Sequence, residues 1–126
     1  MTSLVADRKP TVIVVGASRD TRKFGNISVR AHLQHGFEVF PVNPNTDEVE
    51  GLKAFRSIRE VPLESVDRVT VYLPPTIAID LLEEIAEKHP REVWMNPGSE
   101  SSALLKKAEG LGLPIITACS IVDLKT

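Results

Sequence analysis

The segment between residues 16 and 26 combines small residues with basic side chains, a composition that suits phosphate binding. Gly16 permits close approach of the backbone, and Gly25 stands where a helix opens with free N–H groups that favour an anion. Ser18 can donate a hydrogen bond. Three positive charges stand against one negative charge: Arg19, Arg22 and Lys23 against Asp20. The spacing differs from the GxGxxG fingerprint, so the segment predicts a phosphate loop, with a solvated basic turn as the alternative.

The residues after the second apolar run indicate which nucleotide such a loop would take. A domain that binds NAD usually presents a carboxylate there, which holds a ribose hydroxyl. This chain has Asn43-Pro44-Asn45 instead, while Glu38 lies at the opposite end of the run and Asp47 follows too late. An ordinary NAD site is therefore disfavoured, whereas a nucleotide with an additional phosphate is compatible with Asn43 and the basic loop. A simple turn is the alternative interpretation.

Three further segments follow apolar runs and would face the same edge of a parallel sheet. Pro74-Pro75 lacks backbone donors and stiffens its loop, which suits an apolar or amide-bearing ligand arm. The alternative is that the two prolines only end the strand. Asn96-Pro97-Gly98 permits backbone approach at Gly98, or serves as a cap and turn. Cys119 could be a reactive thiol at the ligand edge, although a free cysteine is more often a small inert hydrophobe.

Recognisable catalytic and metal-binding sets are missing from the sequence. His32 and His35 are spaced for one helix face, but no acidic or cysteine partner stands at a matching spacing, which favours packing or surface roles. His89 ends a predicted helix, where a cation suits the helix dipole. We expect no catalytic or binding role for two further groups. Glu83, Glu84 and Glu87 are predicted to form a solvated helix face, and Tyr72 and Trp94 are predicted to lie in the core. We therefore expect no metal site, no catalytic residues and no enzymatic activity.

Alternating strand and helix patterns must position these loops. Short apolar runs predict five buried strands: residues 11–15, 37–42, 68–73, 92–95 and 114–118. Helical spacing of apolar residues predicts three helices: residues 26–35, 76–89 with Thr76 as N-cap, and 99–111 with Ser99 as N-cap. This alternation predicts an α/β fold, a doubly wound, Rossmann-like sheet of five parallel strands in the order 3-2-1-4-5.

Residues 46–66 do not fit a full helix. An acidic, exposed stretch there is followed by a short extended piece at 51–55 and one helical turn at 57–61. The termini, residues 1–9 and 122–126, are expected to be loose.

Length and composition restrict the class of protein. The chain has 126 residues, 42% hydrophobic and 25% charged, which fits one globular domain over residues 1–126 and argues against disorder. No apolar run reaches the ~18–20 residues of a membrane span, and residues 1–10 lack the apolar core of a signal peptide. The net charge of −2 argues against a nucleic-acid binder, and a single cysteine cannot form an internal disulfide. A soluble cytoplasmic domain is expected.

The order and spacing of several short motifs resemble one known family. They are Val-Val-Gly-Ala-Ser-Arg-Asp at 14–20, Lys-Phe-Gly-Asn at 23–26, Pro-Val-Asn-Pro-Asn at 41–45, Glu-Gly at 50–51, Pro-Pro at 74–75, Asn-Pro-Gly at 96–98 and Ala-Cys-Ser-Ile-Val at 118–122. Over residues 10–122 the chain resembles the stand-alone CoA-binding domain proteins, the YccU-like family. That family is similar to the N-terminal domain of the succinyl-CoA synthetase α-subunit. The resemblance implies a Rossmann-type fold with coenzyme A (CoA) along the strand ends.

The resemblance also implies a role for each matching segment. Gly16, Ala17, Ser18 and Arg19 would hold the phosphates of CoA, and Lys23, Phe24, Gly25 and Asn26 would complete that loop. Asn43, Pro44 and Asn45 would face the adenosine, Pro74 and Pro75 would line the pantetheine arm, and Asn96, Pro97 and Gly98 would lie toward the thiol. The larger synthetases continue into a domain with a phosphorylated histidine. Because this chain ends first, we expect binding without ligase chemistry.

These observations support three hypotheses of different kinds. The first is a non-catalytic module that binds CoA or an acyl-CoA, with its protein partner unknown. The second is an NAD(P)-binding, oxidoreductase-like or redox-sensing domain. Asn43 argues against this hypothesis, because it stands where such a domain usually has a carboxylate. In the third, Cys119 forms a mixed disulfide with CoA and stores or reports its thiol.

Overall fold

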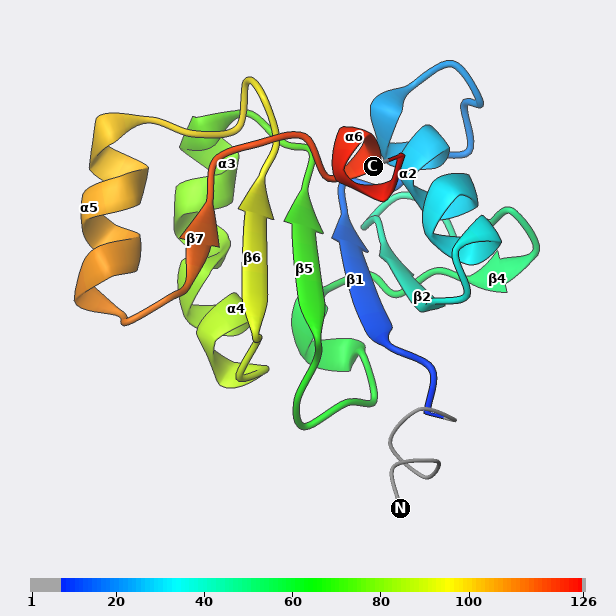
Figure 1. The fold of residues 1–126 in the computed structure, drawn as a ribbon, viewed down its shortest axis with the longest axis horizontal. Coiled ribbons are helices and arrows are strands. Elements are labelled where there is room, and N and C mark those ends of the chain that lie inside the picture. The colour runs from blue at the N-terminus through cyan, green and yellow to red at the C-terminus, as the bar shows by residue number, and fades with distance from the viewer. Residues whose placement is uncertain (1–7, 126) are drawn as a thin grey trace.

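The computed structural model describes residues 8–125 and contains the predicted five-stranded parallel sheet (Figure 1). Its strands are β1 (Thr11–Val15), β2 (Glu38–Val42), β5 (Arg68–Val71), β6 (Glu92–Met95) and β7 (Ile115–Ile116). Each strand falls within a predicted apolar run. Because every pairing is parallel, the carboxyl ends of all five strands lie along one edge of the sheet.

The strand order is β2-β1-β5-β6-β7, so the expected order 3-2-1-4-5 is wrong. The expected order would place residues 37–42 between two strands, but Pro41 has no N–H to donate there and suits an edge strand. β5 is buried at all four positions, as a central strand should be. Between β2 and β5, the residues Ile58, Val61 and Val66 pack in the core opposite the helix that follows β1, so this connection crosses that face.

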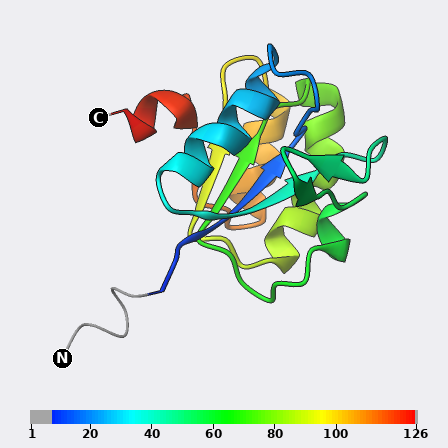
Figure 2. The same cartoon turned by 90° about the vertical axis from the view of Figure 1, so that its right-hand side faces the viewer.

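Helices cover both faces of the sheet (Figures 1 and 2). One face carries α2 (Phe24–Gln34) and α6 (Ser120–Leu124). The other carries α3 (Pro75–Ala78), the 3₁₀ turn η2 (Ile79–Leu81), α4 (Leu82–Glu87) and α5 (Ser102–Gly110). The doubly wound, Rossmann-like arrangement predicted from the sequence is therefore confirmed.

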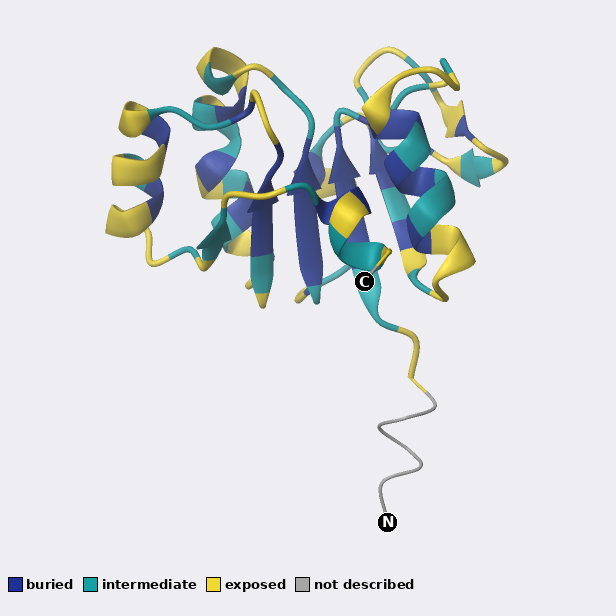
Figure 3. Ribbon diagram, turned by 45° about the horizontal axis from the view of Figure 1, so that its top comes forward, coloured by how far each residue is buried: buried dark blue, intermediate teal, exposed yellow. Residues whose placement is uncertain are grey.

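Each face of the sheet has its own apolar core (Figure 3). On the α2 side, Val12 and Val14 pack with Val29 of the helix. On the other side, Ile13 and Val69 pack with the helices through a set of fully buried side chains: Leu82, Ile85 and Leu104. Alternate residues of β1 thus point to opposite faces, and the strand is buried on both, as its continuous apolar run predicts.

Residues 46–66 form a small hairpin and a 3₁₀ turn, close to the expected pieces. The hairpin pairs β3 (Glu48–Val49) with β4 (Leu52–Lys53), and its turn uses positive φ at Glu50 and Gly51. The 3₁₀ turn η1 spans Ile58–Glu60 and buries Ile58 in the core.

The helix caps differ from those expected. α3 begins at Pro75 after Pro74, and Thr76 provides no side-chain cap. Ser101 caps α5, because its Oγ accepts from the N–H of Leu104 at 3.1 Å. The expected cap, Ser99, is buried and accepts instead from the N–H of Leu73 at 3.1 Å. Leu73 lies just past the end of β5, where its N–H needs an acceptor.

The described parts of both termini contact the rest of the fold. Residues 120–124 form α6, and Asp123 pairs with the buried Arg68 at 3.0 Å. Arg8 makes two hydrogen bonds to Asp67, at 2.9 and 3.1 Å. The expected looseness of residues 1–7 and 126 lies outside the described residues. None of the described helices has the length and apolar character needed to cross a bilayer.

Candidate functional site

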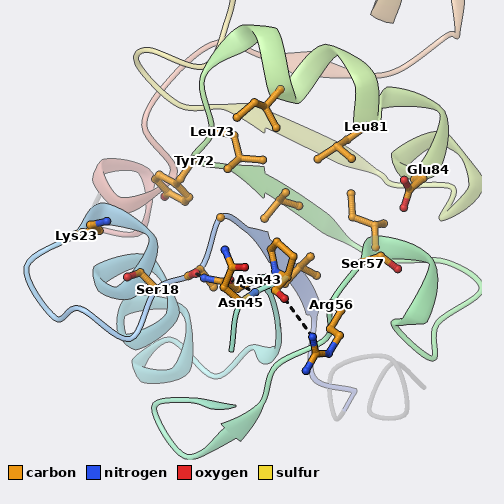
Figure 4. Close-up of a pocket in the computed structure, with 17 residues that line it drawn as sticks. Ser18, Lys23, Asn43, Asn45, Arg56, Ser57, Tyr72, Leu73, Leu81 and Glu84 are labelled. Carbon is orange, nitrogen blue, oxygen red and sulfur yellow. Dashed lines mark hydrogen bonds between the residues drawn. The ribbon is translucent and has the colours of Figure 1, made fainter. Parts of the chain in front are cut away.

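A cavity of about 570 Å³ opens at the carboxyl ends of β1, β2 and β5 (Figure 4). After β1 the chain enters α2 on one face of the sheet, whereas Ile58 and Val61, farther along from β2, pack on the other face. Open α/β sheets bind ligands where connections diverge in this way. The lining combines apolar side chains with a polar margin: Val15, Gly16, Ala17, Ser18, Lys23, Val42, Asn43, Pro44, Asn45, Arg56, Ser57, Ile58, Tyr72, Leu73, Ile77, Leu81 and Glu84.

Two glycines let the first loop pack tightly between β5 and α2. Gly16 has φ +86°, and a Cβ there would lie 2.6 Å from the carbonyl oxygen of Tyr72. A Cβ on Gly25 would collide with the carbonyl oxygen of Gly16. The start of α2 therefore rests directly on the end of β1, beside the cavity, where its free N–H groups favour an anion.

Two asparagines hold the loops that border the cavity. The Nδ2 of Asn43 donates to the carbonyl oxygen of Ala17 at 2.7 Å, which ties the loop after β2 to the loop after β1. Asn26 is fully buried, and its Nδ2 donates to the carbonyl oxygen of Ser18 at 2.8 Å and to Glu50 at 3.0 Å. Asn26 does not line this cavity, so the structure gives it a supporting position.

The positive charge expected in the first loop is divided. Lys23 lines the cavity, whereas the guanidinium of Arg22 pairs with Asp20 at 3.1 Å. Arg19 is exposed and does not line this cavity or the two smaller cavities beside it. A second cation comes from Arg56, which the sequence patterns do not single out and whose guanidinium pairs with Asp47 at 3.1 Å.

Two smaller cavities extend the site along the strand ends. The first, of about 330 Å³, shares Gly16, Lys23, Tyr72 and Leu73 with the main cavity. Its other lining residues are Ser99 and most of the remaining predicted positions: Phe24, Gly25, Pro74, Pro97 and Gly98. The second, of about 90 Å³, is lined by Phe24, Tyr72, Asn96, Pro97 and the half-buried Cys119. We call these three adjoining cavities the groove.

Tyr72 lines all three cavities, and its position is fixed from the side of α6. Its hydroxyl lies 2.8 Å from the Oγ of Ser120, which is also 2.7 Å from the hydroxyl of Thr70. Asn96, buried at the end of β6, donates to Thr70 at 2.7 Å and accepts from the N–H of Ser120 at 2.9 Å. The interpretation of Tyr72 as a core residue is therefore only half right, because one side of the ring faces the groove.

The structure adds lining residues that the sequence patterns did not indicate. Most come from two segments: Arg56, Ser57 and Ile58 after β4, and Ile77, Leu81 and Glu84 on the helices after β5. The first group lies where the sequence has no regular period. Glu84 does not belong to a solvated face as expected, because its Oε1 is buried. Pro75 lines none of the three cavities and forms the first turn of α3.

His32 in α2 and His35 at its C-cap have different surroundings. His32 is fully buried; its Nδ1 donates to the carbonyl oxygen of Ser28 at 2.8 Å, and its Nε2 lies 3.4 Å from the guanidinium of Arg68. Burial lowers the pKa of His32 to about 4. His35 is exposed and bonds to the carbonyl oxygen of Ala31. Within residues 8–125, no group of three or more His, Cys, Asp or Glu side chains could hold a metal ion.

Comparisons with known proteins agree with this arrangement. The α-subunit of an ADP-forming acetate–CoA ligase II from Pyrococcus furiosus is 36% identical over 78 residues, which are 61% of this chain and 17% of that subunit. A conserved hypothetical protein of known structure from Pyrococcus furiosus is 37% identical, with a TM-score of 0.80 over 92% of this chain and 99% of that one. A dinucleotide-forming acetyl-CoA synthetase 1 from Ca. Korarchaeum cryptofilum, solved with phosphate and ADP, is 26% identical with a TM-score of 0.73 over 94% of this chain and 28% of that one.

The chain thus spans less than a third of these two enzymes, but nearly all of the hypothetical protein. A family model described as a CoA binding domain matches residues 10–125. This match covers every strand of the sheet and all three cavities. The chain therefore belongs to the CoA binding domain family.

Proposed function

We propose that the groove binds CoA or an acyl-CoA and that this chain performs no reaction on it. The observation that carries the proposal is the main cavity, which joins the tightly packed start of α2 to an apolar recess at the sheet's switch point. Family membership supports CoA as the ligand. The residues that line the main cavity include no histidine and no cysteine.

The polar and apolar parts of the groove fit different parts of CoA. The pyrophosphate and 3′-phosphate would lie near Ser18, Lys23 and Arg56, where N–H groups and cations favour anions. The pantetheine arm would follow Tyr72, Leu73 and Pro74 into the second cavity. This placement leaves the thiol near Pro97 and Cys119.

Calorimetry with four ligands tests this proposal. We expect CoA to bind, dephospho-CoA to bind more weakly because it lacks the 3′-phosphate, and NADH and NADPH to bind more weakly than CoA. Asn43 supports the last expectation, because it stands where an NAD-binding domain presents a carboxylate and its amide is bonded to Ala17. Absence of heat with CoA and acetyl-CoA at millimolar concentration, or tight binding of a nicotinamide dinucleotide alone, would overturn the proposal.

The position of Cys119 supports a further chemical proposal, a mixed disulfide with CoA. In that step the Cys119 thiolate attacks CoA disulfide, one S–S bond forms while another breaks, and one CoA leaves as its thiolate. Intact mass after incubation with CoA disulfide should show one CoA adduct, which Cys119→Ser abolishes. An unmodified wild-type mass, or the same adduct on Cys119→Ser, would refute the step.

A further inference from the structure

One carboxylate that lines the main cavity has an oxygen with no hydrogen-bond partner in the described part of the chain. Glu84 lies in the first turn of α4 and lines the cavity, and its Oε1 is buried with no hydrogen-bond partner among the described residues. A buried acceptor without a donor carries a desolvation cost, and a rotation of the carboxylate toward the cavity would let a bound donor remove it. The neighbouring carboxylates have donors of their own: Glu83 pairs with Lys107 at 3.1 Å, and Glu87 pairs with Arg59 at 2.9 Å.

Glu84 stands at the end of the cavity away from the first loop. Figure 4 shows Glu84 beside Ser57 and Leu81 at one end, with Lys23 and Ser18 at the other. Apolar side chains fill much of the space between: Val42, Ile58, Ile77 and Leu81. A phosphate beside Glu84 would meet a like charge, whereas a flat, weakly polar base with an outward N–H donor matches both the apolar walls and the free acceptor.

We propose that Glu84 accepts a hydrogen bond from the exocyclic amine of adenine and selects adenine over bases with a carbonyl at that position. This inference rests on the proposed function, since it assigns the base end of the same groove. A purine with a carbonyl there would place oxygen lone pairs against the carboxylate and leave Oε1 unpaired. Sites built to bond one donor discriminate strongly against analogues that lack it.

The experiment compares CoA with its analogue in which hypoxanthine replaces adenine. Titration calorimetry of the full chain should show CoA binding at least about tenfold more tightly, the scale of one charge-assisted hydrogen bond. Glu84→Gln should bring the ratio of the two affinities to about twofold or less, because an amide can accept from the amine or donate to the carbonyl. Glu83→Gln, one residue away and exposed, should keep the wild-type ratio.

The outcomes separate this inference from the proposed function. If wild-type protein binds neither compound, the proposed function fails. If wild-type protein binds both with similar affinity, or if the ratio is the same in wild type and Glu84→Gln, CoA binding stands and the role of Glu84 is refuted. Glu84→Leu gives a second measurement, since removing the acceptor altogether should also remove the preference for adenine, and its thermal midpoint shows whether the variant is folded.

Discussion

At the scale of single residues, Lys23 and Arg19 share a short loop but differ in placement. Lys23 lines two of the three cavities, whereas Arg19 lies outside all of them. We expect Lys23→Ala to weaken CoA binding by ~1–3 kcal/mol, the scale of a charge-assisted contact. Calorimetry at fixed salt is the measurement, because high salt screens the same interaction.

Arg19→Ala is the matched comparison for Lys23→Ala, since it removes one positive charge from the same loop. The resemblance implies a phosphate contact for Arg19, whereas its exposure favours a smaller, salt-dependent effect. Equal affinities for wild type and both variants would show that the phosphates lie elsewhere.

His32 makes the stability of the fold depend on pH. Its pKa is lowered to about 4 in the folded state by burial, from 6.5, so the unfolded chain binds the proton more readily. Stability is therefore complete above pH 6.5 and falls as the pH drops toward 4, by up to ~3 kcal/mol at about 1.4 kcal/mol per pKa unit. Urea unfolding at pH 7.0 and 4.5 measures this loss.

The control for the pH effect is a variant in which this histidine cannot titrate. His32→Gln should flatten the pH dependence between 7.0 and 4.5 even if it lowers stability at both values. His35→Gln alters an exposed side chain on the same helix and should keep the wild-type slope. An unchanged slope in His32→Gln would assign the effect to other groups.

The sequence predicts those lining residues that lie in the turns after the strands, because glycine, asparagine and proline mark such turns. Gly16 and Asn43 follow apolar runs directly, and Pro97 comes one residue later, so their place at the strand ends can be predicted from the fold class alone. Arg56 and Glu84 could not be found in this way, because contacts across the fold bring them to the cavity from an irregular segment and from a helix face that looks solvated. The sequence pattern places the carboxylate of Glu84 on a solvated helix face, and only the packing around α4 shows that its Oε1 is buried.

At the scale of elements, the contact between α2 and β1 depends on a missing side chain. Gly25→Ala would push a Cβ into the carbonyl oxygen of Gly16, so the start of α2 must move away from the cavity. We expect lower stability and weaker CoA binding together. Chemical denaturation and calorimetry on the same preparation measure both.

Gly36→Ala tests whether backbone strain alone explains that result. Gly36 has φ +81° after α2, but a Cβ there meets no atom within 4 Å. The substitution should cost ~1–2 kcal/mol of stability, the scale of a non-glycine residue in this conformation, and leave CoA affinity unchanged. A loss of affinity in Gly36→Ala as large as in Gly25→Ala would contradict the role assigned to the α2–β1 contact.

The elements were predictable where the pattern was local. Every strand could be placed from its apolar run, but the strand order depends on which face the chain crosses between β2 and β5. Within β2, Pro41 indicates an edge position, because it has no N–H to donate to a second neighbouring strand. The prediction of Ser99 as an N-cap is wrong for a similar reason. Its Oγ accepts a hydrogen bond from the N–H of Leu73, a partner distant in sequence.

At the scale of the whole molecule, Arg68 connects four parts of the fold. It pairs with Glu92 and Asp123 at 3.0 Å each, and its guanidinium lies 5.3 Å from the ring of Phe37 and 4.8 Å from that of Trp94. Arg68 is 8% exposed, whereas the side chains of its two carboxylate partners are about 40% exposed and can be hydrated without it.

Arg68→Leu should therefore lower stability by ~2–3 kcal/mol, below the ~3–5 of a fully buried pair. Trp94 is the single tryptophan, so its fluorescence in a urea titration reports the loss. Arg59→Leu, which removes an exposed partner of Glu87, should shift the midpoint little. Equal shifts in the two variants would mean that α6 is not anchored through Arg68.

The hydrogen bond between Tyr72 and Ser120 has a consequence for the speed of ligand entry. Tyr72, Asn43 and Asn96 already have protein partners before any ligand arrives, so these walls of the groove keep one set of rotamers in the empty state. The entropy lost on association then falls mainly on the long, flexible arm of the ligand. Association should follow a single exponential whose rate rises linearly with ligand concentration, as for a preorganised receptor.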